Sequence, residues 1–247
     1  MIILRDGQVV QSVQFKHTNV IHYDAVHAIE TFNRWSVDEI VFLNVSRTPD
    51  GQQQFLDIVE QVSEHCFVPL AAGGWITNED YGAQLVARGA DKLVVNSAIK
   101  RQPELVKQLI TRFGSQCVVA SIDYKSTDQG EQVVIDRGAE PIGMHPVTWA
   151  QYAEQLGCGE IFLNSVDHDG NRKGYNLQEL NNVANAVSIP VIAFGGVFRW
   201  QHLLDGIVHG ADAVAAANIF HYTEHATKRA KRYLADRGIP VRQEGTL

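Results

Sequence analysis

Two acidic side chains stand where stretches of small and apolar residues end, and acids in such places can transfer protons. Asp123 follows residues 118–122, which are all apolar or small. Asp169 follows a second apolar run, which ends at Asn164, and Gly170 comes directly after the acid. A carboxyl group that leaves a buried strand is a good candidate for a general acid or base. We predict catalytic roles for Asp123 and Asp169; the simpler alternatives are a salt bridge or loop cap for Asp123 and a plain turn for Asp169.

Glycine and small polar residues after other apolar runs indicate phosphate binding. Exposed backbone amides near a helix N-terminus commonly hold a phosphate at such positions. The residues that we assign to phosphate or substrate are Gly195, Gly196 and Asn218 late in the chain, Gly74, Asn96 and Ser97 about 121 residues earlier, and Asn164 and Gly170 near the second acid. Two phosphate sites on opposite sides of one cleft would suit an elongated ligand with a phosphate at each end.

The chain nearly repeats itself at an interval of 120 or 121 residues. Residues 39–44 return as 160–164, and residues 89–91 return as 210–212. A unit of this length is too long for a solenoid repeat. We predict one domain over residues 1–247, made of two related halves, about 1–120 and 121–247. Trp75 stands where the second half has Gly196, so it would narrow the first phosphate site or turn it into a stacking surface.

Eight short apolar runs rich in β-branched residues alternate with stretches of helical period. The predicted strands are 2–4, 40–43, 68–72, 92–95, 117–122, 161–163, 191–194 and 213–217. The predicted helices are 25–35, 55–65, 78–88, 103–113, 147–156, 177–187, 200–209 and 223–237. Continuous apolar strands are typical of a parallel sheet that is covered on both faces. Eight such alternations favour a closed (β/α)8 TIM barrel of the α/β class, with its chemistry at the carboxyl ends of the strands.

Composition excludes several classes of function. The formal net charge is -7, and the basic cluster at 228–232 is typical of a solvated helix face, so we expect no nucleic-acid partner. We find neither a leader sequence nor an apolar run of membrane-span length, and the three cysteines are unclustered, which favours a cytoplasmic protein. The histidines show no metal-ligand spacing with Glu or Cys, and we expect no metal and no cofactor.

Motifs along essentially the whole chain resemble the cyclase subunit of imidazole glycerol phosphate synthase, the HisF family. They are Asp6-Gly7, Gly73-Gly74, Arg88-Gly89-Ala90-Asp91-Lys92, Asn96-Ser97, Ser121-Ile122-Asp123-Tyr124-Lys125, Asp167-His168-Asp169-Gly170 and Gly210-Ala211-Asp212. The resemblance implies a barrel that takes ammonia from a HisH-like glutaminase subunit docked beneath it. The ammonia would pass through the barrel and close an imidazole ring on a bis-phosphate at the top face.

Three positions depart from the family pattern. The family pairs an acid at the end of strand five, matched by Asp123, with an acid at the end of strand one, where this chain has Ile3. Asn44 stands in place of an acid after strand two, and Gln11 in place of a lysine in the first loop. Since loss of general acid–base help costs on the order of 10²-fold or more in rate, ordinary cyclase turnover is doubtful.

The base of the barrel keeps the charged pattern of the family. Glu39, Lys92 and Glu160 match residues that ring the ammonia entrance, and Asp91 is then the candidate contact for the glutaminase. The alternative is a set of solvated salt bridges. The segment after Gln11 looks like the first loop of a paralogous branch that supplies ammonia for the amidation of surface sugars, which makes Lys16 a candidate ligand contact or a simple surface charge.

Three functions remain open. The first is an ammonia-channelling subunit of a glutamine amidotransferase, which serves a separate sugar amidotransferase in lipopolysaccharide biosynthesis and has weak or absent cyclase activity. The second is a genuine cyclase of histidine biosynthesis, a lyase that uses Asp169 as its second acid. The third is a barrel that binds a phosphosugar without chemistry.

Overall fold

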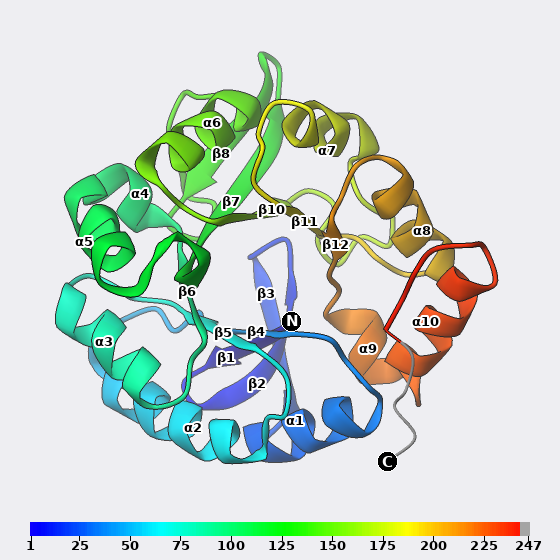
Figure 1. Cartoon of the computed structure of the whole chain (residues 1–247), viewed down its shortest axis with the longest axis horizontal. Coiled ribbons are helices and arrows are strands. Elements are labelled where there is room, and N and C mark those ends of the chain that lie inside the picture. Colours follow the sequence, from blue (N-terminus) through cyan, green and yellow to red (C-terminus); the bar gives the residue numbers. More distant parts are fainter. Residues whose placement is uncertain (243–247) are drawn as a thin grey trace.

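Eight parallel strands form the wall of a barrel, as the alternation of the sequence predicts. The computed structural model describes residues 1–242. The wall strands are β1 (Ile2–Arg5), β4 (Ile40–Asn44), β5 (Leu70–Gly73), β6 (Lys92–Val95), β7 (Val118–Thr127), β10 (Glu160–Ser165), β11 (Val191–Phe194) and β12 (Ala213–Val214). Neighbours pair in parallel from β1 to β12. The sheet curls into a ring with helices outside, the (β/α)8 arrangement (Figure 1).

The ring has a seam between its last and first strands. Among the residues described, β12 and β1 do not pair as strands. Instead the amino group of Met1 donates a hydrogen bond of 2.8 Å to the carbonyl oxygen of Ala216.

The helices surround the strands and begin and end at identifiable signals. The longer helices are α1 (Ala25–Arg34), α2 (Gln52–His65), α3 (Glu79–Ala87), α5 (Pro103–Phe113), α6 (Pro146–Leu156), α7 (Leu177–Ala184), α8 (Trp200–Val208) and α10 (Ala226–Ala235), and the short ones are α4 (Ser97–Arg101) and α9 (Asn218–Tyr222). Asp24 caps α1 by accepting from Val26 N, and Gly157 ends α6 in the left-handed conformation. Within residues 1–242, no helix has both the length and the apolar character needed to cross a bilayer.

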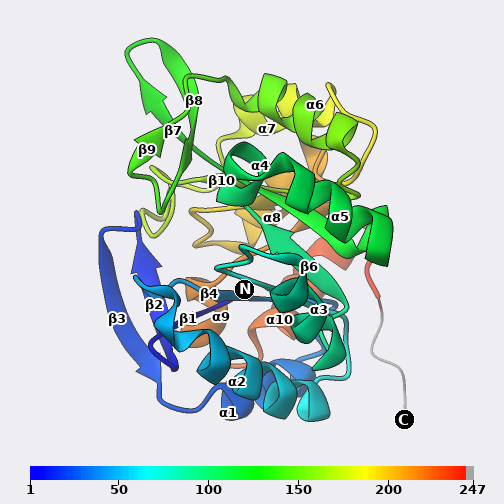
Figure 2. The ribbon, with the colours of Figure 1, turned by 90° about the vertical axis from the view of Figure 1, so that its left-hand side faces the viewer.

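Two antiparallel extensions were not predicted from the sequence. Strands β2 (Gln8–Val13) and β3 (His17–His22) form a hairpin after β1. Strands β8 (Gly130–Ile135) and β9 (Glu140–Pro141) extend the sheet beyond β7. Both extensions project from the same end of the barrel, where the carboxyl ends of the wall strands lie (Figure 2).

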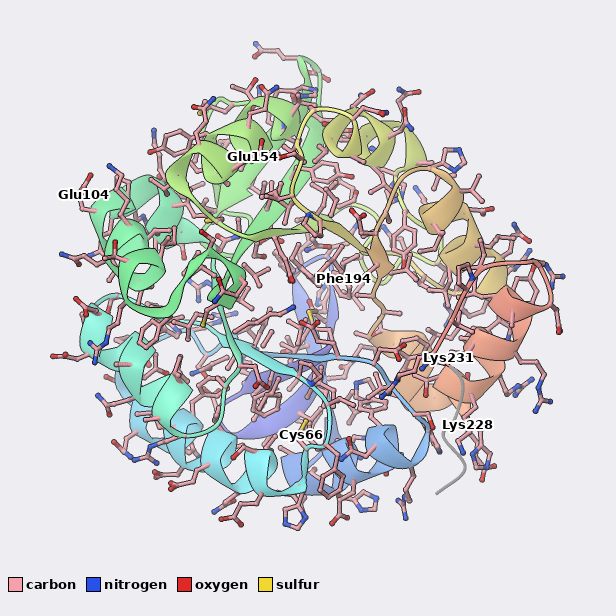
Figure 3. All side chains as sticks on the ribbon, viewed as in Figure 1. Cys66, Glu104, Glu154, Phe194, Lys228 and Lys231 are labelled. Carbon is pink, nitrogen blue, oxygen red and sulfur yellow. The ribbon has the colours of Figure 1, made fainter. Side chains whose placement is uncertain are left out.

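Apolar side chains form two separate cores because successive residues of a strand face opposite sides. The larger core lies between strands and helices and includes Ile2, Leu4 and Phe42. The smaller core fills the inside of the ring with Val41, Ala71, Val94, Val119, Phe162, Ile192 and Phe194. Phe194 lies near the middle of the ring (Figure 3), and its side chain stacks on that of Phe162 at a centroid distance of 5.1 Å.

Candidate functional site

Two wall strands, β6 and β10, carry a charged, an apolar and an amide side chain in the same order from the amino end to the carboxyl end. Alternate positions of a strand share one face, and Val94 of β6 and Phe162 of β10 belong to the inner core. Two residues before them stand Lys92 and Glu160, at the amino ends of the strands. Two residues after them stand Asn96 and Asn164, at the carboxyl ends. The barrel interior is thus charged at its base, apolar in the middle and polar at its mouth.

Asp123 lies at the mouth, held by the two asparagines. Asn164 Nδ2 donates to Asp123 Oδ1 at 2.7 Å, and Asn96 Nδ2 donates to Asp123 Oδ2 at 2.9 Å. Burial raises the pKa of Asp123 to about 6, although both hydrogen bonds lower it. Lys125 Nζ donates a hydrogen bond of 2.7 Å to Gly138 O, and the charge of Lys125 also lowers the pKa of Asp123. A carboxyl group with a pKa near 6 can both donate and accept a proton near neutral pH.

Asp169 is a second buried acid within electrostatic reach of Asp123. Burial raises its pKa to about 7; the hydrogen bond from Ser12 lowers this pKa, and the charge of Asp123 raises it further. In the described part of the chain, Oδ2 of Asp169 is buried and has no hydrogen-bond partner. A buried carboxyl oxygen without a partner is costly, and such groups often serve a ligand or a reaction.

Ile3 lies on the wall of the same interior, at the position where the family resemblance predicts an acid. Ile2 and Leu4 face the outer core, so by alternation Ile3 faces inward. It is 5% exposed and pairs with Leu43 of β4 and Val10 of β2. The side chain has no proton to give, and it makes this wall of the mouth apolar.

The second predicted phosphate site borders a large cavity. Gly170 and Asn218 line this cavity, which has a volume of about 670 Å³. Gly195 and Gly196 have positive φ angles of 100° and 89°, and a Cβ on Gly196 would lie 2.3 Å from Gly174 O. Only glycine can make this turn without displacing the neighbouring chain.

The first predicted phosphate site is occupied by protein contacts. Trp75 adopts a φ of 59°, and its indole Nε1 donates to Ser46 O at 2.9 Å. Asn96 is committed to Asp123, and Ser97 Oγ accepts a hydrogen bond of 3.2 Å from Asp136 N. A Cβ on Gly74 would lie 2.2 Å from Asn44 O, so its backbone is as tightly placed as that of the second site. The side chains here leave less room for a ligand.

The charged residues at the base form one cluster. Lys92 Nζ lies 3.0 Å from Glu39 Oε2 and 2.7 Å from Glu160 Oε1, and all three side chains are largely buried. Burial opposes the charge of Lys92, but the hydrogen bonds that it donates to the two glutamates raise its pKa overall. For Glu39, burial raises the pKa against the attraction of Lys92. The cluster is therefore a partly desolvated ion triad, unlike the solvated salt bridges that were the alternative.

Asp91 lies near the base cluster, where its charge raises the pKa of Glu39, whereas Lys16 lies apart from these groups. Asp91 Oδ2 accepts a hydrogen bond of 2.8 Å from Leu70 N, and Asp212 Oδ2 accepts one of 2.9 Å from Val191 N in the second half. This repeated contact gives Asp91 a structural role at the start of β5. Lys16 is exposed at the turn between β2 and β3 and does not line the cavity.

Sequence reasoning missed two parts of the site. Ser12 lies on the unpredicted hairpin, where alternation was too short to stand out. The cavity is also lined by Arg172, Arg199 and Arg229, which are far apart in the sequence and come together only in the fold. Within residues 1–242, no group of three or more His, Cys, Asp or Glu side chains is placed to hold a metal ion.

The chain matches known proteins over nearly its whole length. A family model described as "Histidine biosynthesis protein" matches residues 1–226. The imidazole glycerol phosphate synthase subunit HisF of Chlorobium limicola is 40% identical over 240 residues, which cover 96% of this chain and 94% of that protein. The range matched by the family model includes the wall strands and the acids at the mouth. The chain belongs to the HisF family of histidine biosynthesis proteins.

Proposed function

We propose that the protein is the synthase subunit of a glutamine amidotransferase, which receives ammonia at the base of the barrel and delivers it to the mouth. One observation carries this proposal. The ion triad of Glu39, Lys92 and Glu160 and the acids Asp123 and Asp169 lie at opposite ends of one apolar interior. The name of the Chlorobium relative, a synthase subunit, supports a second chain as partner, and we infer a HisH-like glutaminase.

The apolar interior favours neutral ammonia over ammonium. An unpaired cation inside a layer of Val94, Val119 and Phe162 would lose its hydration without compensation. Lys92 is paired with two glutamates at the entrance, so selection against ammonium rests on the apolar layer and not on the charge of the cluster. A neutral molecule that enters beside Lys92 therefore meets no charge until it reaches Asp123 and Asp169.

The mouth offers a proton acceptor and a place for a phosphorylated ligand. Asp123, with a pKa of about 6, can take a proton from the attacking ammonia. The glycine turn at Gly195 and Gly196 lies next to the cavity, where a phosphate would find backbone amides. Because Ile3 leaves the first half without an acid, we infer weak cyclase activity of the subunit itself and delivery of ammonia to a separate acceptor, such as a sugar amidotransferase of lipopolysaccharide biosynthesis.

The second candidate is a genuine cyclase of histidine biosynthesis. The observation that favours it is the pair of buried acids, since pKa values of about 6 and about 7 allow one acid to donate while the other accepts. A barrel that only binds a phosphosugar is less well supported. It would give no reason for the buried, unpartnered oxygen of Asp169.

The deciding experiment is steady-state turnover of the bis-phosphate imidazole precursor with saturating ammonium salt and no partner. The proteins are wild type, Asp123→Asn, and Asp167→Asn as a control that removes a nearby carboxylate. Turnover that falls on the order of 10²-fold in Asp123→Asn alone would establish the cyclase and overturn ammonia delivery as the main role. Absent or marginal turnover in all three, together with a stable 1:1 complex with a HisH-like glutaminase in analytical ultracentrifugation, supports the leading proposal. Failure of both turnover and complex formation would leave only the scaffold.

A further inference from the structure

The cavity beside the second phosphate site reaches well beyond the glycine turn. Its wall comes from the β2–β3 hairpin, from the segments that follow β10, β11 and β12, and from α10. Its volume of about 670 Å³ is within the range of pockets that enclose a whole small organic ligand. A single phosphate on backbone amides would leave most of this space unfilled.

The cavity is strongly basic in a protein whose formal net charge is -7. Arg172, Arg199 and Arg229 line it, and among residues 1–242 no acidic side chain does. In the part of the chain that the structure describes, no salt bridge neutralises any of these three arginines. Guanidinium groups bind phosphate oxygens in a bidentate way, so this lining suits an anion with several phosphate oxygens.

Aromatic rings lie beside these charges. Phe198 is 44% exposed and Tyr222 is 62% exposed, and both line the cavity together with Trp200. The guanidinium carbon of Arg172 lies 4.6 Å from the centre of the Phe198 ring. Exposed rings gain free energy when a flat apolar group covers them, and a nucleobase is such a group.

We propose that this cavity binds a nucleoside diphosphate or a compound that contains one. The diphosphate would lie between Arg199 and Arg229, and the base would stack on the Phe198 ring. This inference rests on the proposed function, because it names the class of the phosphorylated ligand that the same cavity would hold. Because Gly170 and Asn218 border the same cavity, the group carried by the diphosphate would face the mouth of the barrel, near Asp169.

Direct binding tests the proposal without ammonia, glutaminase or turnover. Isothermal titration calorimetry would use ADP, UDP, inorganic pyrophosphate and inorganic phosphate as probes. We expect at least one nucleoside diphosphate to bind more tightly than pyrophosphate, and pyrophosphate more tightly than phosphate. Arg199→Ala and Arg229→Ala should each weaken binding of the nucleoside diphosphate about tenfold or more, because each removes charge-assisted hydrogen bonds.

One further variant tests the contribution of the Phe198 ring apart from that of the arginines, and another serves as a control. Phe198→Leu should weaken binding of the nucleoside diphosphate about tenfold and leave pyrophosphate unchanged, since only the base stacks. Arg34→Ala, on α1, removes an exposed arginine far along the chain and should leave every affinity within about twofold. All four changes are at side chains exposed to solvent or at the cavity wall, and thermal unfolding monitored by circular dichroism would verify that each variant is folded.

Several outcomes would overturn the proposal. One is pyrophosphate binding as tightly as ADP and UDP, with no response to Phe198→Leu, because the cavity would then hold an anion only. Another is a nucleoside diphosphate affinity that Arg199→Ala and Arg229→Ala do not change. Absence of binding at millimolar concentration, or tighter binding of a short single-stranded oligonucleotide than of either diphosphate, would also refute it. None of these results depends on whether the protein turns over the bis-phosphate.

Discussion

The two halves of the barrel mouth share a backbone and differ in chemistry. The second half presents Asp123 and the buried glycine turn of Gly195 and Gly196, next to the arginine-lined cavity. The first half presents Ile3 in place of the acid and Trp75 in place of the second glycine, with the indole bonded back to Ser46. The candidate site therefore lies on one side of the mouth, although the backbone of the two halves is alike.

The frame itself is repeated in detail. Gly89 and Gly210 have φ angles of 102° and 101°, and Gly74 and Gly195 have φ angles of 107° and 100°. The bonds of Asp91 to Leu70 N and of Asp212 to Val191 N occupy the same places in the two halves. The division into two related halves remains a prediction, and these pairs support it. They indicate that backbone geometry tolerates a change of side-chain chemistry at the mouth.

The largest expected effect comes from restoring an acid to the first half. Ile3→Asp places a carboxyl group on the inner face opposite the existing acids, and we expect turnover of the bis-phosphate with ammonium to rise about 10²-fold over wild type. Ile3→Asn is the matched control, since it has a similar shape and no titratable proton. An equal response of the two variants would show that the lack of an acid at position 3 does not limit the reaction.

A smaller effect on stability is expected from exchanging the turn residues. Gly196→Ala puts a Cβ within 2.3 Å of Gly174 O at a positive φ, and should lower the free energy of unfolding by roughly 3 kcal/mol. Trp75→Gly loses the indole bond but relieves a left-handed φ, so its net change should be within about 1 kcal/mol. Urea denaturation measures both. Similar losses in the two variants would mean that the turns are equally constrained.

The buried acids of the mouth make stability depend on pH. The pKa of Asp169 is raised to about 7, so the folded protein keeps a proton that the unfolded chain releases near pH 4. The stability contributed by this proton is complete below about pH 4 and is lost as the pH rises through 7. The free energy of unfolding of Asp169→Asn, measured relative to that of the wild type, should therefore rise by on the order of 2 kcal/mol between pH 4 and pH 8. Chemical denaturation at several pH values tests this, and a difference that stays constant with pH would contradict it.

The smallest effects are expected at the repeated aspartates. Asp91→Ala and Asp212→Ala each remove one bond to a strand amide and should each cost about 1 kcal/mol in urea denaturation. The two variants also test the predicted contact between Asp91 and the glutaminase. If Asp91 touches a glutaminase, Asp91→Ala alone should weaken the complex, and equal glutaminase affinity in the two variants would assign Asp91 a structural role only.

Sequence patterns predicted the frame well because its signals are local. The predicted strand 92–95 and the predicted helix 103–113 coincide with β6 and α5, since buried β-branched runs and amphipathic stretches have clear periods. The predicted helix 223–237 was too long. In the structure α9 ends at Tyr222 and α10 begins at Ala226. The break follows from the left-handed conformation of His225, which the residue types in this segment do not predict.

The candidate site was predictable only where it follows a strand. Asp123, Asn164 and Gly195 stand at the ends of apolar runs, so their common location followed from the barrel. The contact of Ser12 with Asp169 depends on the folding back of the β2–β3 hairpin, and the three arginines of the cavity come from three separate segments. Residues that come together from separate segments show no periodic pattern in the sequence, so their contacts could not be predicted from it.

The pairing of β7 with β10 has a consequence for how the molecule fluctuates. These two strands pair at six positions, from Glu160 opposite Val119 to Ser165 opposite Tyr124, whereas β11 and β12 pair at two. Asn164 and Asp123 are opposite one another within the longer ladder. Local opening begins where few backbone hydrogen bonds must break, which places it at the seam between β12 and β1. We therefore expect the barrel to open locally on one side while the hydrogen bond between Asn164 and Asp123 on the other side stays in place.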